Sequence, residues 1–130
     1  MAVIFPDIEK TLVAYFNAAL PSHGASGVRV ATKKAQPDDV QPAKELVITA
    51  AYNREQDYVL RSASVTLEVY ADTYANANAL SLLVAALVRG CTTDGIKNAE
   101  VVLGPTRIGE DGTQEKRYLD VQLMVKGSDL

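Results

Sequence analysis

A chain of 130 residues, of which 48% are hydrophobic and 22% charged, has the length and composition of one globular domain and not of a disordered tail. Its 13 basic and 16 acidic residues leave a formal net charge of −3, and the longest basic run is the pair Lys33-Lys34. A nucleic-acid-binding domain normally carries a basic stripe that neutralises phosphates, so this balance argues against direct nucleic-acid binding.

We expect one domain over residues 1–130, with a folded core over about 7–127. Cys91 is the only cysteine, which excludes an intramolecular disulfide. The first residues lack the basic segment and apolar stretch of a secretory signal. The longest apolar stretch, 79–88, is too short to span a bilayer. These features predict a soluble protein.

The first predicted element is a helix over residues 7–20. Asp7 follows Pro6 and can start the helix, where an acidic side chain is favourable. Pro21 is expected to end it. Apolar residues at helical spacing form one face of this segment, namely Ile8, Leu12, Tyr15, Phe16, Ala19 and Leu20.

Two strands separated by a polar loop are predicted next. Apolar and polar residues alternate over 27–34, and β-branched residues favour a strand over 45–52. Residues 35–44 between them are rich in Pro, Asp and Gln and predict a loop. The charged segment 53–58 is expected to form the tip of a hairpin that leads into the following strand.

The clearest strand signal covers residues 62–72, where apolar odd positions alternate with polar or amphipathic even positions. This period of two predicts a strand with one buried face. The pattern then changes to a helical period over 73–90. Asp72 or Thr73 can cap the start of this helix, and Gly90 is suited to its end.

Two further strands are predicted, over 99–103 and 117–126. Gly104-Pro105 is expected to end the first, and residues 109–115 are expected to form a turn. The order is helix, three strands, helix, two strands. It predicts an α+β fold with a mixed, mainly antiparallel sheet of about five strands and two helices.

No catalytic or metal site can be recognised in the sequence. His23 is the only histidine, and no nucleophile or orienting acid is paired with it. Cys91 has no evident base to activate its thiol. One His and one Cys cannot make a typical zinc site, and no phosphate-binding glycine loop is present. The sequence therefore predicts no cofactor.

Three residues on the outward sides of strands carry more apolar surface than these positions usually have: Tyr70, Tyr118 and Met124. Two interpretations stay open. The second helix or a long loop covers them, or they lie in a subunit interface, where tyrosine is enriched.

With its elements in this order, the chain resembles the tail terminator, or tail-completion, proteins of long-tailed bacteriophages over about 7–127. The resemblance rests on the first amphipathic helix and on three segments. They are VRVATKKAQPDDVQPAKELVITAAY, a strand, polar loop and strand; SVTLEVYADTYANANALSLLVAALVRG, an alternating strand that runs into an alanine-rich helix; and AEVVLGPTRIGEDGTQEKRYLDVQLMVKG, a hairpin. Phage head–tail joining proteins fit this pattern almost as well.

The resemblance implies a homo-oligomeric ring, commonly a hexamer, without catalysis. The ring would cap the tail tube, stop its polymerisation and offer a face to the head connector. The implied partners are further copies of the chain, the tail tube protein and the head connector protein, with no specific nucleic acid and no membrane. The implied place is the head-proximal end of the virion tail, after synthesis in the bacterial cytoplasm.

Under this resemblance the polar loops 35–44 and 105–115 become the natural contact elements. They contain the acid pairs Asp38-Asp39 and Glu110-Asp111, which in such loops are usually solvated. Further charged residues could set the register between subunits, namely Arg54, Glu55, Arg61 and Arg89.

Two other classes of function stay open. A small α+β enzyme, or a ferredoxin-like binding module of unknown ligand, predicts a concave pocket that holds an acid with a shifted pKa. A nucleic-acid-binding module that uses a sheet face predicts salt-dependent binding.

Overall fold

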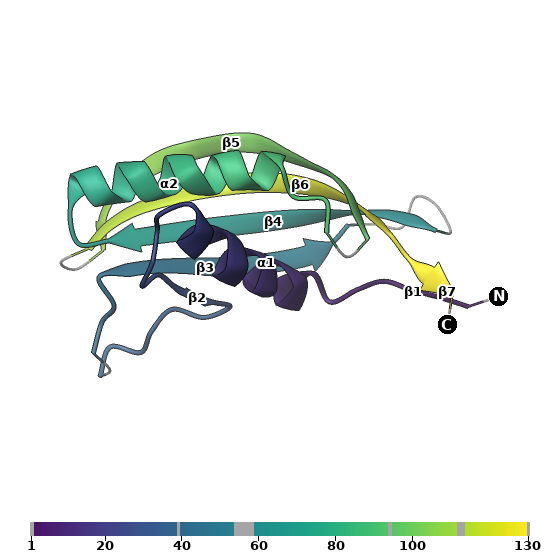
Figure 1. Ribbon diagram of the computed structural model, residues 1–130, viewed down its shortest axis with the longest axis horizontal. Helices are drawn as coiled ribbons and strands as arrows, with labels where there is room; N and C mark the ends of the chain where they lie inside the picture. The colour runs from purple at the N-terminus through teal and green to yellow at the C-terminus, as the bar shows by residue number, and fades with distance from the viewer. Residues whose placement is uncertain (1, 39, 54–58, 94, 112–113, 130) are drawn as a thin grey trace.

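The computed structural model describes residues 2–38, 40–53, 59–93, 95–111 and 114–129. Two helices lie side by side on one face of a five-stranded sheet (Figure 1). A small ribbon, in which β1 (Val3–Ile4) pairs antiparallel with β7 (Ser128–Asp129), extends beyond one end of this sheet. This two-stranded ribbon was not predicted, because two-residue strands carry no periodicity to detect.

The strands of the large sheet lie in the order β2-β3-β4-β6-β5. Their bounds are Arg29–Ala31 for β2, Lys44–Tyr52 for β3, Leu60–Ala71 for β4, Gln114–Lys126 for β6 and Ile96–Asp111 for β5. β2 pairs parallel with β3, and the other pairs are antiparallel. The α+β class and the mainly antiparallel sheet predicted from the sequence are thereby confirmed.

Helix α1 covers Ile8–Ser22. Asp7 is its N-cap, and its side chain accepts a hydrogen bond of 3.2 Å from the Lys10 backbone N–H. The prediction that Pro21 ends the helix was wrong. A proline in the last turn removes one N–H, and the N–H groups of His23 and Gly24 close this turn on the carbonyls of Leu20 and Pro21.

Helix α2 covers Tyr74–Arg89. Its ends confirm the prediction, since the Thr73 side chain accepts a hydrogen bond from the Asn76 N–H at 3.1 Å and Gly90 is the C-cap. Ala77 and Ala85 are buried on its inner face. These small side chains allow α2 to lie close to β4, β6 and β5.

β5 is much longer than predicted, and the prediction that Gly104-Pro105 ends it was wrong. A proline is tolerated here because β5 is an edge strand, and register shifts on both sides of Pro105 interrupt the ladder. Gly104 has φ +97, and a Cβ there would lie 2.5 Å from the Tyr118 carbonyl oxygen. The predicted contact loop 105–115 is therefore mostly strand: β5 runs to Asp111 and β6 starts at Gln114.

The hydrophobic core lies between the helices and the sheet. Alternate residues of the three central strands point towards the helices, as the period of two predicts. Their largest fully buried side chains are Leu46 and Ile48 of β3, Val65, Leu67 and Val69 of β4, and Leu119, Leu123 and Val125 of β6. Phe16 and Leu20 of α1 and Val84 of α2 fill the space above them.

Candidate functional site

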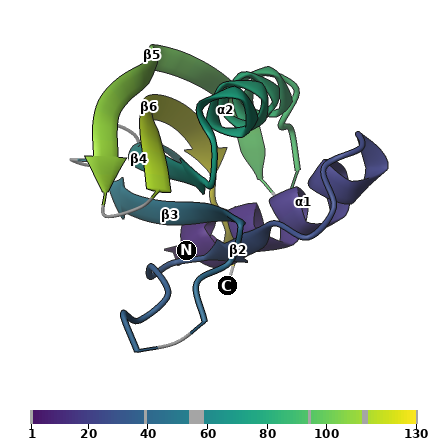
Figure 2. The ribbon, with the colours of Figure 1, turned by 90° about the vertical axis from the view of Figure 1, so that its left-hand side faces the viewer.

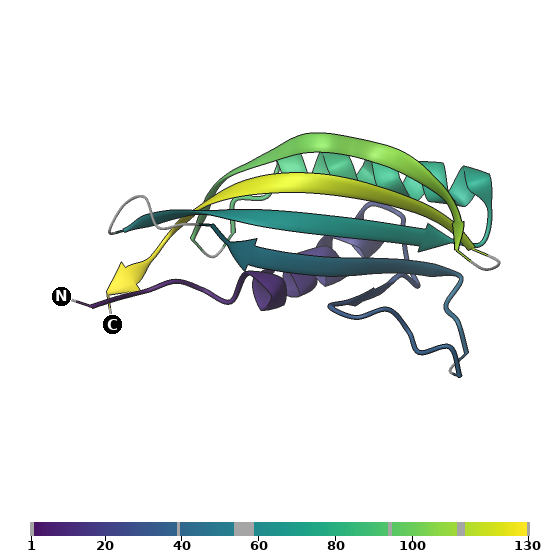
Figure 3. The same cartoon turned by 180° about the vertical axis from the view of Figure 1, so that it is seen from behind.

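The opposite face of the sheet carries neither of the two helices, as the end-on and rear views show (Figures 2 and 3). We call it the helix-free face. Its side chains are largely polar and pair across β4 and β6. Thr66 donates a hydrogen bond to Asp120 at 3.2 Å, and Ser64 donates one to Gln122 at 3.3 Å. These pairs satisfy the polar groups of the sheet without a covering layer.

A loop of residues 32–43 joins β2 to β3, and we call it the β2–β3 loop. Its anchor is Glu45, a carboxylate with 0% exposed area at the start of β3. The Arg29 guanidinium and the Ala35 backbone N–H, at 2.8 Å, donate to Glu45 Oε2. Lys34 Nζ lies 3.6 Å from Glu45 Oε1. A buried carboxylate requires such partners, so Glu45 fixes the base of the loop.

Further hydrogen bonds hold the β2–β3 loop to the sheet and to itself. Lys34 Nζ donates to Gln114 at 2.9 Å and to Gln41 at 3.1 Å. Gln114 in turn donates to the Pro42 carbonyl at 3.1 Å, which ties the loop to β6. Gln41 donates to the Gln36 carbonyl at 2.6 Å and closes the loop near its tip. These hydrogen bonds tie the described residues of the loop to β6 and to each other.

Tyr70 lies under this loop and is only 3% exposed. Lys34 Nζ is 4.5 Å from the centre of its ring, and its hydroxyl donates to Glu68 Oε2 at 2.9 Å. Burial, followed by the hydrogen bond to Glu68, raises the pKa of Tyr70 to about 12. Of the two interpretations given for the outward tyrosines, cover by a long loop describes Tyr70, which has no surface left for a partner.

Glu68 and Lys116 complete this cluster through an ion pair of 2.9 Å. Burial acts to raise the pKa of Glu68, but the hydrogen bonds from Lys116 and Tyr70 outweigh it and lower the pKa. The hydrogen bond to Glu68 raises the pKa of Lys116. The charges therefore stabilise each other and the loop above them.

The structure does not bring the other predicted interface residues together. Tyr118 and Met124 are half-buried on the helix-free face, while Arg89 is exposed at the end of α2. Asp38 is exposed in the β2–β3 loop. Arg61 is half-buried against the rings of Tyr52 and Phe5, at 4.8 and 5.5 Å, and donates to the Asn53 carbonyl at 2.9 Å.

Some predicted residues lie outside the described part of the chain. These are Asp39, Arg54 and Glu55. For Glu110 and Asp111 the backbone belongs to β5, while their side chains are outside the description.

The sequence reasoning missed a second cluster at the start of α2, in which the buried Arg117 lies beneath the exposed Tyr74 and Arg107. Arg117 is 2% exposed, and its Nε and Nη2 donate to Asn78 Oδ1 at 3.2 and 3.0 Å. Its guanidinium and that of Arg107 lie 5.0 and 5.2 Å from the centre of the Tyr74 ring. Glu115 forms an ion pair of 3.0 Å with Arg107. One feature of the sequence indicated this burial: Arg117 lies in phase with the apolar residues of β6, so its side chain points to the same face of the sheet.

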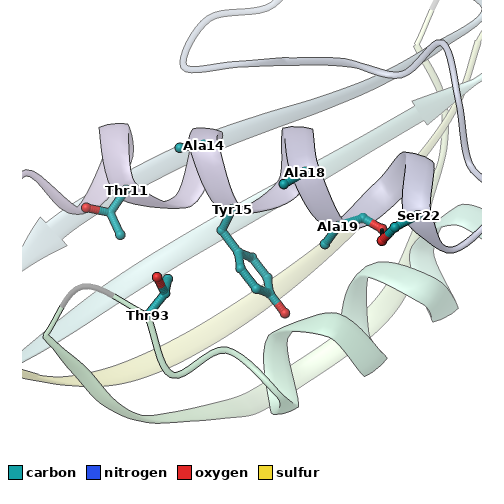
Figure 4. Close-up of a pocket in the computed structure, with 7 residues that line it drawn as sticks. All are labelled: Thr11, Ala14, Tyr15, Ala18, Ala19, Ser22 and Thr93. Carbon is teal, nitrogen blue, oxygen red and sulfur yellow. Dashed lines mark hydrogen bonds between the residues drawn. The ribbon is translucent and has the colours of Figure 1, made fainter.

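A hollow of about 370 Å³ lies between α1 and the chain that follows α2 (Figure 4). Tyr15 crosses it and donates a hydrogen bond of 2.6 Å to the Leu87 carbonyl of α2. The lining consists of methyl, hydroxyl and aromatic groups, from Thr11, Ala14, Tyr15, Ala18, Ala19, Ser22 and Thr93. The acids whose pKa is shifted, Glu68 and Asp72, do not line this hollow.

Cys91 and His23, the two residues considered for chemistry in the sequence, lie in the core and at a helix end. Cys91 is 1% exposed, and burial raises the pKa of its thiol. His23 is the exposed C-cap of α1, with Nδ1 2.8 Å from the Ala19 carbonyl. Among the described residues no three His, Cys, Asp or Glu side chains are grouped to hold a metal ion. Neither described helix is long and apolar enough to cross a membrane.

No protein-family model matches this chain, and no curated protein matches it in sequence.

Proposed function

We propose that this chain is a structural protein of a long-tailed bacteriophage. It forms a homo-oligomeric ring, most simply a hexamer, that caps the tail tube, stops its polymerisation and provides the face for head joining. In this role it is not an enzyme and uses no cofactor. Its partners are further copies of itself, the tail tube protein and the head connector protein, and it works at the head-proximal end of the tail.

The observation that carries the proposal is the one-sided construction of the domain. Both helices pack on one face of the sheet, and the other face is a polar surface with a preformed loop above one end. The same order of elements, with the Pro-containing loop between β2 and β3, is the basis of the resemblance to tail terminators. Because one fold serves many functions, the surfaces have to carry the functional argument.

The surfaces suit assembly better than catalysis. Polar groups of the helix-free face pair with each other, as Thr66 and Asp120 do. Glu45 Oε2 accepts hydrogen bonds from Arg29 and Ala35, while Oε1 lies 3.6 Å from Lys34 Nζ and has no hydrogen-bond partner among the described residues. These contacts hold the Glu45 carboxylate at the base of the loop. An interface, in contrast, uses preformed loops and paired polar groups as they stand.

Size-exclusion chromatography with light scattering tests the proposal, with and without a tail tube protein. A hexamer of the 14.0 kDa chain would weigh about 84 kDa. We expect a closed oligomer in solution or on the end of the tube, and shorter tubes when the protein is present during polymerisation. A strict monomer that neither binds the tube nor limits its length would contradict the proposal.

A further inference from the structure

Val40 is the most exposed large apolar residue of the described chain, with 96% of its area open. It lies between Gln36 and Pro42 near the tip of the β2–β3 loop, where Asp38 and Gln41 are also exposed. An apolar side chain this exposed gains free energy when a partner removes it from water, in proportion to the area buried. Because the hydrogen bonds of Lys34, Gln41 and Gln114 already order the loop, binding through Val40 would lose little conformational entropy.

A site of matching character lies on the same molecule. The hollow between α1 and Thr93 has about 370 Å³, and its walls carry the methyl groups of Ala14, Ala18 and Ala19 beside the Tyr15 ring. This is room for a valine side chain and the backbone next to it. The hollow is lined by α1 and Thr93, on the side of the sheet that carries the helices. The β2–β3 loop, in contrast, packs through Lys34 on Tyr70 and Gln114 of the helix-free face.

Because the loop and the hollow lie on different sides of one domain, Val40 reaches a hollow only on a second copy. A contact between two different surfaces is heterologous, and repeated contacts of this kind produce a closed ring or a filament. The charges next to the two surfaces agree with this contact. Asp38 is exposed two positions before Val40 in the chain, and Lys10 is exposed on α1 one turn before Ala14.

We propose that Val40 of one copy inserts into the hollow on α1 of the next copy, and that Glu45 is the positioning residue that holds the loop for this contact. The inference rests on the proposed ring, and it adds which surfaces meet. Asp38 would then lie close to Lys10 of the neighbouring copy and set the register. In such a contact the buried apolar side chain would supply affinity, and the pair of opposite charges would fix the orientation of the two copies.

Disulfide trapping tests this contact directly. The double variant Val40→Cys with Ala18→Cys places one thiol on the loop and one in the hollow. The matched control combines Val40→Cys with Ala86→Cys, because Ala86, like Ala18, is an exposed alanine of a helix. Cys91 is buried and does not compete. A mild oxidant is added to both proteins, and covalent oligomers are counted on a non-reducing gel.

We expect a ladder of covalent oligomers for the Ala18 pair, formed at least about tenfold faster than any product of the Ala86 pair, because docking raises the effective concentration of the two thiols. Equal rates, or a ladder from the Ala86 pair alone, would overturn the inference. The mass of the wild-type oligomer in solution distinguishes a failure of the proposed contact from a failure of the proposed ring. If the wild type forms a ring but the Ala18 pair forms no ladder, the contact is wrong and the ring stands. If the wild type assembles neither alone nor on the tube, both are wrong.

The role of Glu45 is tested in the same trapping assay. Glu45→Gln added to the Ala18 pair keeps the size of the side chain and removes the charge that holds Arg29 and Lys34. We expect slower trapping, by about tenfold, and faster tryptic cleavage after Lys33 and Lys34, in a protein that is still folded by circular dichroism. The control Glu100→Gln changes an exposed acid on β5. A purely structural role would lower the melting temperature of the Glu45 variant and leave its trapping rate at the level of this control.

Discussion

The two faces of the sheet are stabilised in different ways, and β4 shows both along one strand. Leu67, 1% exposed, lies under the helices, while its neighbour Thr66 points to the helix-free face and donates a hydrogen bond to Asp120. Stability on the covered face comes from apolar area removed from water. Hydrogen bonds on the other face replace bonds to water and contribute little net free energy. The fold therefore depends on one face of the sheet and leaves the other free to make contacts.

The largest expected loss of stability comes from a substitution on the covered face of the sheet. Leu67→Ala removes a fully buried side chain between the sheet and the helices and should lower the free energy of unfolding by about 3 kcal/mol. Thr66→Ala, one residue away on the helix-free face, should cost less than about 1 kcal/mol. Urea unfolding followed by circular dichroism measures both. Equal losses of stability would contradict the conclusion that the two faces are stabilised differently.

Arg117 should behave as a core residue despite its charge. Arg117→Ala removes two hydrogen bonds to Asn78 and the packing against Tyr74, and we expect a loss of about 2 kcal/mol. Arg89→Ala is the control, because Arg89 is exposed and should change stability by less than about 0.5 kcal/mol. Thermal unfolding compares the two variants, and a loss for Arg89→Ala as large as that for Arg117→Ala would contradict this assignment.

Alkaline pH should weaken the cluster under the loop. The folded pKa of Tyr70, about 12, exceeds its ordinary value of 10.0, so its stabilising contribution is complete below pH 10 and is lost as pH rises through 12. Tyr70→Phe cannot ionise and should lack this loss. Between pH 9 and 11.5 the wild type should lose about 2 kcal/mol more than the variant in urea unfolding.

The groups that face Tyr70 decide how this titration is interpreted. Lys34, Glu68 and Lys116 surround its ring or hydroxyl, and the pKa of Lys116 is also raised. Lys116 is present in both proteins, so its own loss of charge lowers the stability of both. A parallel decrease in wild type and Tyr70→Phe would show that the phenol is not the group responsible.

Much of the fold could be predicted because apolar residues recur at regular spacing along its strands and helices. The alternation along β4 and the caps Asp7 and Thr73 are local signals, and the structure contains them as expected. The end of β5 could not be predicted in this way. Gly104-Pro105 has the local chemistry of a turn, but pairing with β6 continues through bulges on an edge strand. Tertiary pairing prevailed over the local preference.

The candidate site was less accessible to sequence reasoning. Asp38 and the polar loop were visible as composition, yet Glu45 had the position of an ordinary outward residue at the start of a strand. It is buried because the loop folds back and brings Arg29, Lys34 and Ala35 to its carboxylate. Such a contact depends on the path of the loop, which no periodicity encodes. The anchor Val40 is likewise defined by its exposure and not by a motif.

The smallest expected effect on stability belongs to the most informative variant. Val40→Ser removes the proposed anchor from the loop tip, and Leu82→Ser removes an exposed apolar residue, 61% open, from α2. Neither should change the free energy of unfolding by more than about 0.5 kcal/mol, because both side chains are in water in the single chain. Any difference between the two variants in assembly therefore reports on the contact between copies.

Assembly through Val40 can be measured by sedimentation velocity of the wild type, Val40→Ser and Leu82→Ser at matched concentrations, with and without the tail tube protein. We expect the wild type and Leu82→Ser to form the same oligomer, while Val40→Ser is shifted at least about tenfold towards monomer, the effect of losing about 1.4 kcal/mol from each contact. An unchanged oligomer for Val40→Ser, or loss of the oligomer for Leu82→Ser alone, would contradict this expectation.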